Sequence, residues 1–290
     1  MLPLIKSSPP STSALSWDRS RAIPWGRRES RRTRWPKVAW TIRRQRKIST
    51  DRPFLSIIVP AYNEEHRLPK TLERITEYLG QQEYTAEIIV VDDGSQDGTA
   101  RVVEAFMARH PNLSLIRNEH RGKGYAVKTG MLAARGEHLF LCDADLSMPI
   151  EELAKFLPPL LNDYDVAIGS REAIGARRYD EPLYRHLMGR VFNFIVKLLT
   201  VRGFEDTQAG FKCFKAEVAR DLFSHQTMDG WAFDVEILYV AQKRGYRVVE
   251  VPIHWYYMAN SRIEPIGDTV RMFRDVVRVR LNDLKGVYDE

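Results

Sequence analysis

The 290-residue sequence has few of the features that assign a chain to a class at first sight. Its only cysteines are Cys142 and Cys213, too few for a disulfide framework or a four-cysteine zinc site, so a reducing compartment is expected. It has no run of 18 apolar residues to span a bilayer, and its N-terminus lacks the apolar core of a secretory signal. We therefore expect a cytoplasmic protein, or one that is peripheral on the cytoplasmic face of a membrane.

Glycine-rich nucleotide motifs are missing as well. Neither G-x-G-x-x-G nor G-x-x-x-x-G-K-[ST] follows any segment that is typical of a strand. A dinucleotide-binding fingerprint and a P-loop are thus excluded, and any nucleotide site must be built from other residues.

Basic residues are concentrated at one end of the chain, whose formal net charge is +6. Residues 1–50 contain 13 Lys and Arg against two acids, whereas the other 240 residues contain 31 basic and 36 acidic groups. The body of the protein is therefore mildly acidic, and no nucleic acid is expected as its partner.

Residues 1–52 form a basic tail that is rich in Ser, Pro and Arg and has no apolar periodicity. This composition favours a disordered extension. Two alternatives stay open: interleaved Trp and Arg suit a juxtamembrane anchor at an anionic bilayer, and an Arg- and Ser-rich segment with few acids also suits a transit peptide.

Beyond the tail, apolar strands alternate with amphipathic helices. Strands are expected at Leu55–Val59, Glu87–Val91, Leu113–Ile116, His138–Cys142 and Asp165–Ile168. Helices are expected over Leu68–Leu79, Thr99–Arg109 and Tyr125–Ala134. In the second helix, Val103, Phe106 and Met107 are expected to face inward. The pattern predicts an α/β fold, in which helices flank both faces of a mostly parallel sheet.

Polar segments follow three of these strands directly: Pro60–Glu65, Asp92–Thr99 and Asp143–Pro149. In open parallel sheets, ligands bind beyond the carboxyl ends of the strands, so these segments are the expected site. Asp97 is interpreted as a helix cap. One cap does not need two further carboxylates, so Asp92 and Asp93 are candidates to accept hydrogen bonds from a nucleobase or a ribose.

Asp143 and Asp145 lie two residues apart at the end of the fourth strand. Alternation along an extended chain puts both carboxylates on the same side, which is unfavourable unless a cation lies between them. Oxygen ligands favour Mg²⁺ or Mn²⁺ shared with substrate phosphates. A capped turn is the simpler alternative.

Eight short motifs, taken together, resemble a known family. Four lie in the first half: PAYNEE from Pro60, VVDDGSQDGT from Val90, GKGYAVKTG from Gly122 and DADLS from Asp143. Four lie in the second: GSRE from Gly169, DTQAGFKCF from Asp206, WAFDVE from Trp231 and HWYYMANSRI from His254. In this order they resemble the family 2 glycosyltransferases, which have the Rossmann-like GT-A fold. The likeness covers residues 54–285.

Within that family, the second-half motifs are similar to those of the polyprenyl-phosphate sugar synthases, the dolichyl-phosphate β-glucosyltransferases first and the dolichyl-phosphate mannose synthases next. The resemblance implies inverting, metal-dependent transfer of a hexose to a polyprenyl or dolichyl phosphate at a membrane surface. Glucose from UDP-glucose is favoured as the donor, with mannose from GDP-mannose next. It also implies one domain over residues 53–290, with a nucleotide-sugar half (53–150) and an acceptor half (151–290).

The resemblance assigns roles on the donor side. The base and ribose would be held by Pro60, Tyr62, Glu64 and Asp92 or Asp93. Lys123 and Arg262 would meet the diphosphate, and Gln208 would lie near the donor sugar or the metal. Asp143 would place the nucleotide or the metal, and Asp145 would ligate the metal. Some relatives carry an amide as a further ligand where this chain has Ser147.

On the acceptor side, Arg171 and Arg185 are candidates to clamp a lipid phosphate, because guanidinium pairs bidentately with phosphate oxygens. An ordinary surface charge is the alternative for Arg185. Asp234 is either a structural ion pair or a group near the acceptor, and it is the candidate base if the acceptor is a hydroxyl. The segments Leu187–Val201 and Thr269–Lys285 are expected as C-terminal amphipathic helices, at the membrane interface or packed on the domain.

Two other functions stay open. One is a glycosyltransferase that uses a hydroxyl of a sugar or a protein as its acceptor. The other is a non-catalytic protein that binds a membrane surface or nucleic acid through its basic tail. The acidic strand ends argue against the second, because a binding module has no use for them. The sequence leaves the oligomeric state undetermined.

Overall fold

The computed structural model describes residues 52–182, 186, 189–190, 193, 196, 200–201, 203–258 and 265–289, the first six residues of the last range by backbone only. The expected tail (apart from Arg52), most of the segment 187–201, and the predicted site residues Arg185 and Arg262 lie outside them.

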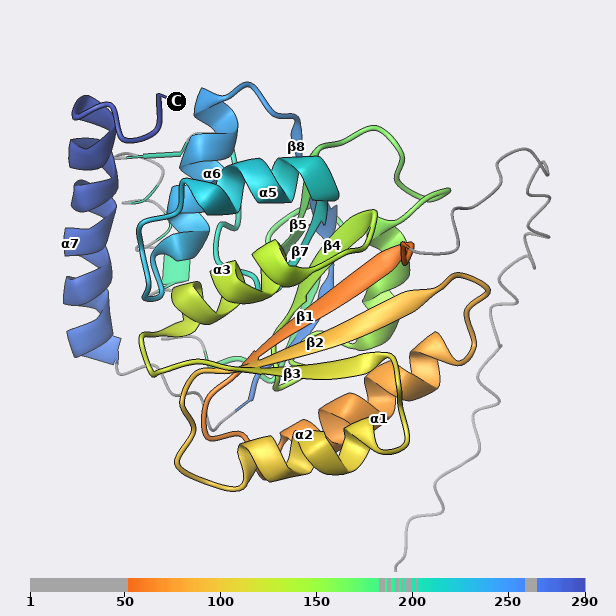
Figure 1. Ribbon diagram of the computed structural model, residues 1–290. Helices are drawn as coiled ribbons and strands as arrows, with labels where there is room; N and C mark the ends of the chain where they lie inside the picture. The colour runs from red at the N-terminus through yellow and green to blue at the C-terminus, as the bar shows by residue number, and fades with distance from the viewer. Residues whose placement is uncertain are drawn as a thin grey trace, which may run out of the picture. The chain divides into compact units, whose positions relative to one another are not determined.

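The centre of the domain is a seven-stranded sheet in the order β3-β2-β1-β4-β7-β5-β8 (Figure 1). The bounds are β1 Leu55–Ala61, β2 Ala86–Asp92, β3 Leu113–Arg117, β4 His138–Cys142, β5 Val166–Ser170, β7 Phe211–Lys215 and β8 Val248–Pro252. Strand β7 runs antiparallel to both β4 and β5, and the other pairs are parallel. The mostly parallel sheet predicted from the sequence is confirmed, with β7 as the reversed strand.

Helices cover both faces of this sheet (Figure 1). Helices α1 (Leu68–Leu79) and α2 (Thr99–Met107) lie on one face, and α3 (Lys123–Ala133), α5 (Ala216–Ser224) and α6 (Phe233–Lys243) lie on the other. Neighbouring residues of β1 show why two cores form. Ile57 and Ile58 are both fully buried, but they belong to different apolar clusters because successive strand residues point to opposite faces.

The strands and helices that the sequence predicted over residues 55–168 lie within two residues of their observed bounds. The sequence did not identify β7 or β8, and β7 is a short segment in which Lys212 interrupts the apolar residues. The prediction that Met107 faces inward was wrong. Its side chain is 37% exposed, because Met107 is the last residue of α2, whereas Val103 and Phe106 are buried.

The C-terminal part adds three elements: the short strands β6 (Arg177–Tyr179) and β9 (His254–Tyr256), which pair in parallel, and helix α7 (Pro265–Leu284). A short 3₁₀ helix, Ile150–Phe156, follows β4. Helix α7 lies beside α6 (Figure 1), where Val276 and Val279 are buried and Tyr239 donates a hydrogen bond to Asp283. In the described ranges, no helix combines the length and the apolar character that crossing a bilayer requires.

Candidate active site

A cavity of about 470 Å³ opens at the carboxyl ends of β1, β2 and β4. All three strand-end segments that the sequence singled out contribute to its walls. Four parts of the chain line the cavity. They are the ends of β1, β2 and β4 with the residues that follow them (Pro60, Ala61, Tyr62, Glu64, Arg67, Asp93, Asp143, Ala144, Asp145), α3 with the residues just before it (His120, Arg121, Gly122, Lys123, Ala126), the loop before α6 (Gly230, Trp231) and α7 (Arg271, Met272, Asp275).

One wall combines a buried carboxylate with aromatic rings. Asp93 is 2% exposed, and its carboxylate accepts hydrogen bonds from the backbone N–H groups of Arg121 (3.1 Å) and Gly122 (2.9 Å). Nδ1 of His120 lies 2.8 Å from Asp93 Oδ2, and the His120 ring stacks on Tyr62 at 4.1 Å between ring centroids. The wall offers flat rings and a fixed acceptor, which suits a nucleobase and its ribose.

The adjacent Asp92 does something different. Its Oδ1 accepts the backbone N–H of Ser95 at 2.9 Å, so its side chain stabilises the turn after β2, and it is absent from the described lining of the cavity. Asp97 accepts the backbone N–H of Thr99, the first residue of α2, at 2.9 Å. The N-cap position is held by Gly98, so Asp97 stabilises the start of α2 from one residue before the cap. Of the two adjacent carboxylates, it is Asp93 that faces the cavity.

A second part of the cavity wall, here called the acidic end, contains Asp143 and Asp145. Asp143 follows β4 directly, and the ammonium of Lys123 lies 2.7 Å from its Oδ1. Its other oxygen lies against Gly210, where an added Cβ would be only 1.9 Å from Oδ2. Asp145 lines the same cavity, and its Oδ1 accepts the backbone N–H of Ser147 at 2.9 Å. Both carboxylates therefore line the same cavity.

Lys123 lies among three carboxylates. Burial by itself lowers the pKa of the ammonium, but Asp143 and then Asp234 outweigh it, so the pKa is raised and the group is firmly charged. The ammonium also lies 5.2 Å from the centre of the Trp231 ring. Helix α3 thus delivers a fixed positive charge to the acidic end of the cavity.

Asp234, in the first turn of α6, is 3% exposed. Its Oδ1 is 2.7 Å from the ammonium of Lys212, a residue of β7 that is 1% exposed. Burial raises the pKa of Asp234, and Lys212 and Lys123 oppose the rise. Asp234 is part of a buried ion pair, and the described lining of the cavity does not include it.

The acidic end has the chemistry of a site for a divalent cation. No group of three or more His, Cys, Asp or Glu side chains with metal-binding geometry occurs in the described part of the chain. Two carboxylates suffice for a cation that keeps waters and substrate oxygens as its other ligands. Asp143 Oδ1 is buried and already faces a cation, the ammonium of Lys123 at 2.7 Å, which shows that this oxygen can serve a positive charge. The residues present therefore fit Mg²⁺ or Mn²⁺.

On the predicted acceptor side, Arg171 is already paired with Asp206. Its Nε and Nη2 donate to the two carboxylate oxygens of Asp206 at 2.6 and 2.9 Å, and Asp206 is 5% exposed. Burial lowers the pKa of the guanidinium, but Asp206 more than compensates and raises it. Burial would raise the pKa of Asp206, whereas Arg171 holds it well below its usual range. The pair joins the end of β5 to the loop before β7.

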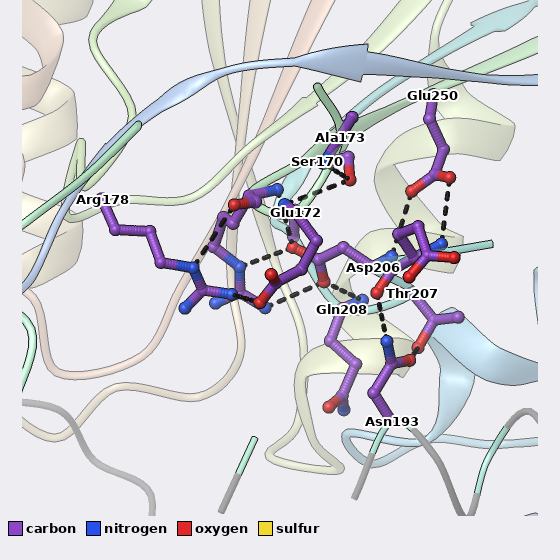
Figure 2. Close-up of polar contacts among 12 residues, drawn as sticks. Ser170, Glu172, Ala173, Arg178, Asn193, Asp206, Thr207, Gln208 and Glu250 are labelled. Carbon is purple, nitrogen blue, oxygen red and sulfur yellow. Dashed lines mark hydrogen bonds and ion pairs between the residues drawn. The ribbon is translucent and has the colours of Figure 1, made fainter. Parts of the chain in front are cut away.

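That loop carries Gln208, which the sequence placed near the donor. Its backbone N–H donates to Asp206 at 3.2 Å, and its side chain extends away from that carboxylate (Figure 2). Glu250 of β8 accepts the backbone N–H groups of Glu205 (2.9 Å) and Asp206 (3.0 Å). The loop is thus anchored from two strands before it reaches Gly210 and the carboxylate of Asp143.

The predicted site residues fall into three groups. Those that line the cavity are Pro60, Tyr62, Glu64, Asp93, Lys123, Asp143 and Asp145. Those that are described but lie outside its lining are Asp92, Arg171, Gln208 and Asp234. Arg185 and Arg262 are not among the described residues, so the proposed phosphate clamp stays a prediction.

Sequence reasoning missed several lining residues. Arg121 directly precedes a recognised motif and Trp231 is the first residue of another, so those motifs could have identified them. His120 also precedes a motif, but its stacking on Tyr62 depends on two loops meeting. Arg271, Met272 and Asp275 come from α7, and no local signal links that helix to the nucleotide half.

Comparisons with known proteins point in one direction. Residues 56–223 match the family model described as Glycosyl transferase family 2. Dolichyl-phosphate beta-glucosyltransferase of Drosophila melanogaster is 39% identical over 255 residues, covering 81% of this chain and 76% of the relative. The Homo sapiens protein of the same name is 35% identical over 255 residues, covering 81% and 77%.

Solved structures agree on the fold. Glucosyl-3-phosphoglycerate synthase from Mycobacterium tuberculosis, in a complex with Mn²⁺, UDP and glucosyl-3-phosphoglycerate, matches with a TM-score of 0.57 at 18% identity, covering 79% of each chain. The same enzyme with UDP alone gives a TM-score of 0.56 at 19% identity.

Proposed function

The chain belongs to glycosyl transferase family 2, and from this premise we propose that it transfers glucose from UDP-glucose to dolichyl phosphate or a related polyprenyl phosphate. The relatives named above support the sugar and the acceptor. The observation that carries the proposal is the cavity itself, with Asp93 and stacked rings on one part of its wall and the carboxylates of Asp143 and Asp145 on another.

In this proposal the nucleotide lies along the cavity. The uracil and ribose contact the wall of Tyr62, His120 and Asp93, with Pro60 and Glu64 beside them. Arg67 donates to Glu64 at 2.6 Å, which holds that carboxylate in place at the cavity edge. UDP-glucose is favoured over GDP-mannose because the relatives are named as glucosyltransferases.

The diphosphate lies at the acidic end. Asp143 and Asp145 would hold Mg²⁺ or Mn²⁺, which when bound offsets the negative charge of the diphosphate. Mn²⁺ is present in the similar synthase structure. Lys123 supplies a further positive charge where the leaving UDP gains its electron pair.

The acceptor phosphate needs no general base, because it is already an anion at neutral pH. One of its oxygens attacks the anomeric carbon, the bond from that carbon to the UDP oxygen breaks, and the configuration inverts. Asp234 favours this acceptor over a hydroxyl. It is 3% exposed and ion-paired with Lys212, so it is poorly placed to take a proton from an alcohol in the cavity.

Helix α7 supports a peripheral contact with the cytoplasmic membrane face. Phe273, Val277, Leu281 and Leu284 follow one another at intervals of four, four and three residues, on one side of the helix. Phe273 is 46% exposed, Leu281 49% and Leu284 79%. The exposed Arg274 and Arg278 flank this stripe, an arrangement that suits an anionic lipid surface.

The direct test is to incubate the protein with UDP-glucose or GDP-mannose, Mg²⁺ or Mn²⁺, and dolichyl phosphate, and to identify the lipid product by mass. We expect glucosyl phosphoryl dolichol with UDP-glucose. Transfer to a water-soluble alcohol with none to the lipid phosphate would refute the proposal.

The membrane contact is tested separately, by flotation with vesicles that contain anionic lipid. The double variant Leu281→Glu, Leu284→Glu should lose most vesicle binding and keep activity on a short, detergent-dispersed acceptor. Leu160→Glu is the matched control. Leu160 is likewise an exposed leucine, at 68%, but it does not belong to α7. Equal binding of all three proteins would refute the role of α7.

A further inference from the structure

We propose that Lys123 occupies the place of a cation at Asp143 until the nucleotide arrives, so that nucleotide and divalent metal bind cooperatively. In the absence of nucleotide, the lysine competes with the metal. Once the diphosphate is bound, the lysine pairs with it and releases Asp143. The inference rests on the proposed function, because it needs a donor with a diphosphate and a metal.

The contacts of Lys123 carry the first step. Its ammonium lies 2.7 Å from Asp143 Oδ1, a buried oxygen. A metal bound to that oxygen would therefore compete with the ammonium for it. The two side chains are 16% and 23% exposed, so water screens the pair only in part. Asp145 and Asp234 add to the negative potential around the ammonium.

The charge balance explains why a cation is needed there at all. Lys212 neutralises one charge of the group formed by Asp143, Asp145 and Asp234. Without Lys123 the cavity end would carry two uncompensated negative charges in a partly buried place, which is unfavourable. If a metal bound while Lys123 stayed in place, two positive charges, the metal and the ammonium, would meet at the carboxylate of Asp143.

The backbone limits the movement to the side chain. Gly122 has φ 126° and packs against Asp229, and a Cβ at Gly124 would lie 2.5 Å from the carbonyl oxygen of Met228. The start of α3 is therefore fixed against the loop before α6. The lysine side chain, by contrast, is a flexible four-carbon chain. A diphosphate bound in the same cavity would give its ammonium a new anionic partner within reach.

The competing possibility is that Lys123 is a permanent structural counter-ion. The two cases differ in a quantity that needs no turnover, namely the affinity for Mn²⁺ in the absence of nucleotide. We would measure it by the electron paramagnetic resonance signal of free Mn²⁺, with and without UDP, for the full chain and three variants.

Lys123→Gln removes the charge and keeps polar character. It should bind Mn²⁺ alone about tenfold more tightly than the wild type, the size of effect expected for losing one partly screened charge-assisted contact. UDP should tighten Mn²⁺ binding in both proteins, but by a smaller factor in the variant, because the competing ammonium that UDP draws away from Asp143 is already absent. The same factors should appear in how much Mn²⁺ tightens UDP binding, since the coupling between two ligands is reciprocal.

Two further variants separate charge from structure. Lys123→Arg keeps a cation and should retain weak binding of Mn²⁺ alone. Lys128→Gln is the matched control: it lies on the same helix, but its ammonium donates to the carbonyl oxygen of Gln226, away from the cavity lining, so both Mn²⁺ affinities should stay at the wild-type value.

The inference would be overturned if folded Lys123→Gln bound Mn²⁺ alone no more tightly than the wild type. It would also be overturned if Lys123→Arg gained as much Mn²⁺ affinity as Lys123→Gln. If UDP bound to none of the proteins, the proposed function would fail instead. The comparison in Mn²⁺ alone would still decide the role of Lys123, so the two failures are distinguishable.

Discussion

The pair of Arg171 and Asp206 gives a sharp prediction, because it decides between two roles for one arginine. A residue that only clamps the acceptor phosphate would contribute to acceptor binding and little to stability. A residue that anchors the loop before β7 would contribute to stability as well. The variant Arg171→Ala separates these cases.

The magnitude follows from the contacts. The substitution removes two charge-assisted hydrogen bonds, at 2.6 and 2.9 Å, from a carboxylate that is 5% exposed. Two backbone donors remain, from residue 171 and from Gln208. A buried charge that loses its partner costs about 3–5 kcal/mol, and the remaining donors put the expected loss near the lower bound, about 3 kcal/mol.

The pH dependence has a definite sign. In the wild type, Arg171 holds the pKa of Asp206 below its unfolded value, so this stabilisation is complete above that value and is lost as the pH falls through the folded pKa. In Arg171→Ala, burial dominates and raises the pKa of Asp206 instead. The loss in free energy of unfolding caused by Arg171→Ala should therefore be largest at neutral pH and become smaller towards pH 4.

The assay is urea unfolding between pH 4 and pH 8, together with the acceptor KM at saturating donor. Arg171→Ala, Asp206→Asn should recover part of the loss, because no unpaired charge remains. Arg74→Ala is the control, since its partner Glu151 is 53% exposed and the pair should contribute at most about 1 kcal/mol. A free energy of unfolding for Arg171→Ala within about 0.5 kcal/mol of the wild type, with a raised acceptor KM, would refute the anchoring role.

Three further predictions test the rest of the site. Asp145→Asn should abolish transfer while the unfolding midpoint stays near the wild-type value, and near-normal turnover would show that its charge serves no metal. Gly210→Ala should lose most Mn²⁺ binding, because the added Cβ would lie 1.9 Å from Asp143 Oδ2; unchanged Mn²⁺ affinity in a folded variant would contradict this. Removal of residues 1–51 should leave the kcat on a detergent-dispersed acceptor within about twofold, since the catalytic cavity is lined by later residues, and loss of UDP binding would place the tail in the domain.

The sequence by itself determined the framework of the donor site. Continuous apolar runs predicted the three strands at whose ends it lies, because a strand buried on both faces leaves a local signal. The strand-end rule then located Asp93, Asp143 and Asp145 at one edge of the sheet. These conclusions needed only residues close together in the chain.

Tertiary structure decided what those residues face. The pair Asp92 and Asp93 looks equivalent in sequence, but opposite side-chain directions make one a turn acceptor and the other a wall of the cavity. Strand β7 inserts antiparallel between β4 and β5, which brings Lys212 to Asp234 and Gly210 to Asp143. Such contacts join segments far apart in the chain, and their stability comes from burial and charge pairing across the fold. No local pattern records them.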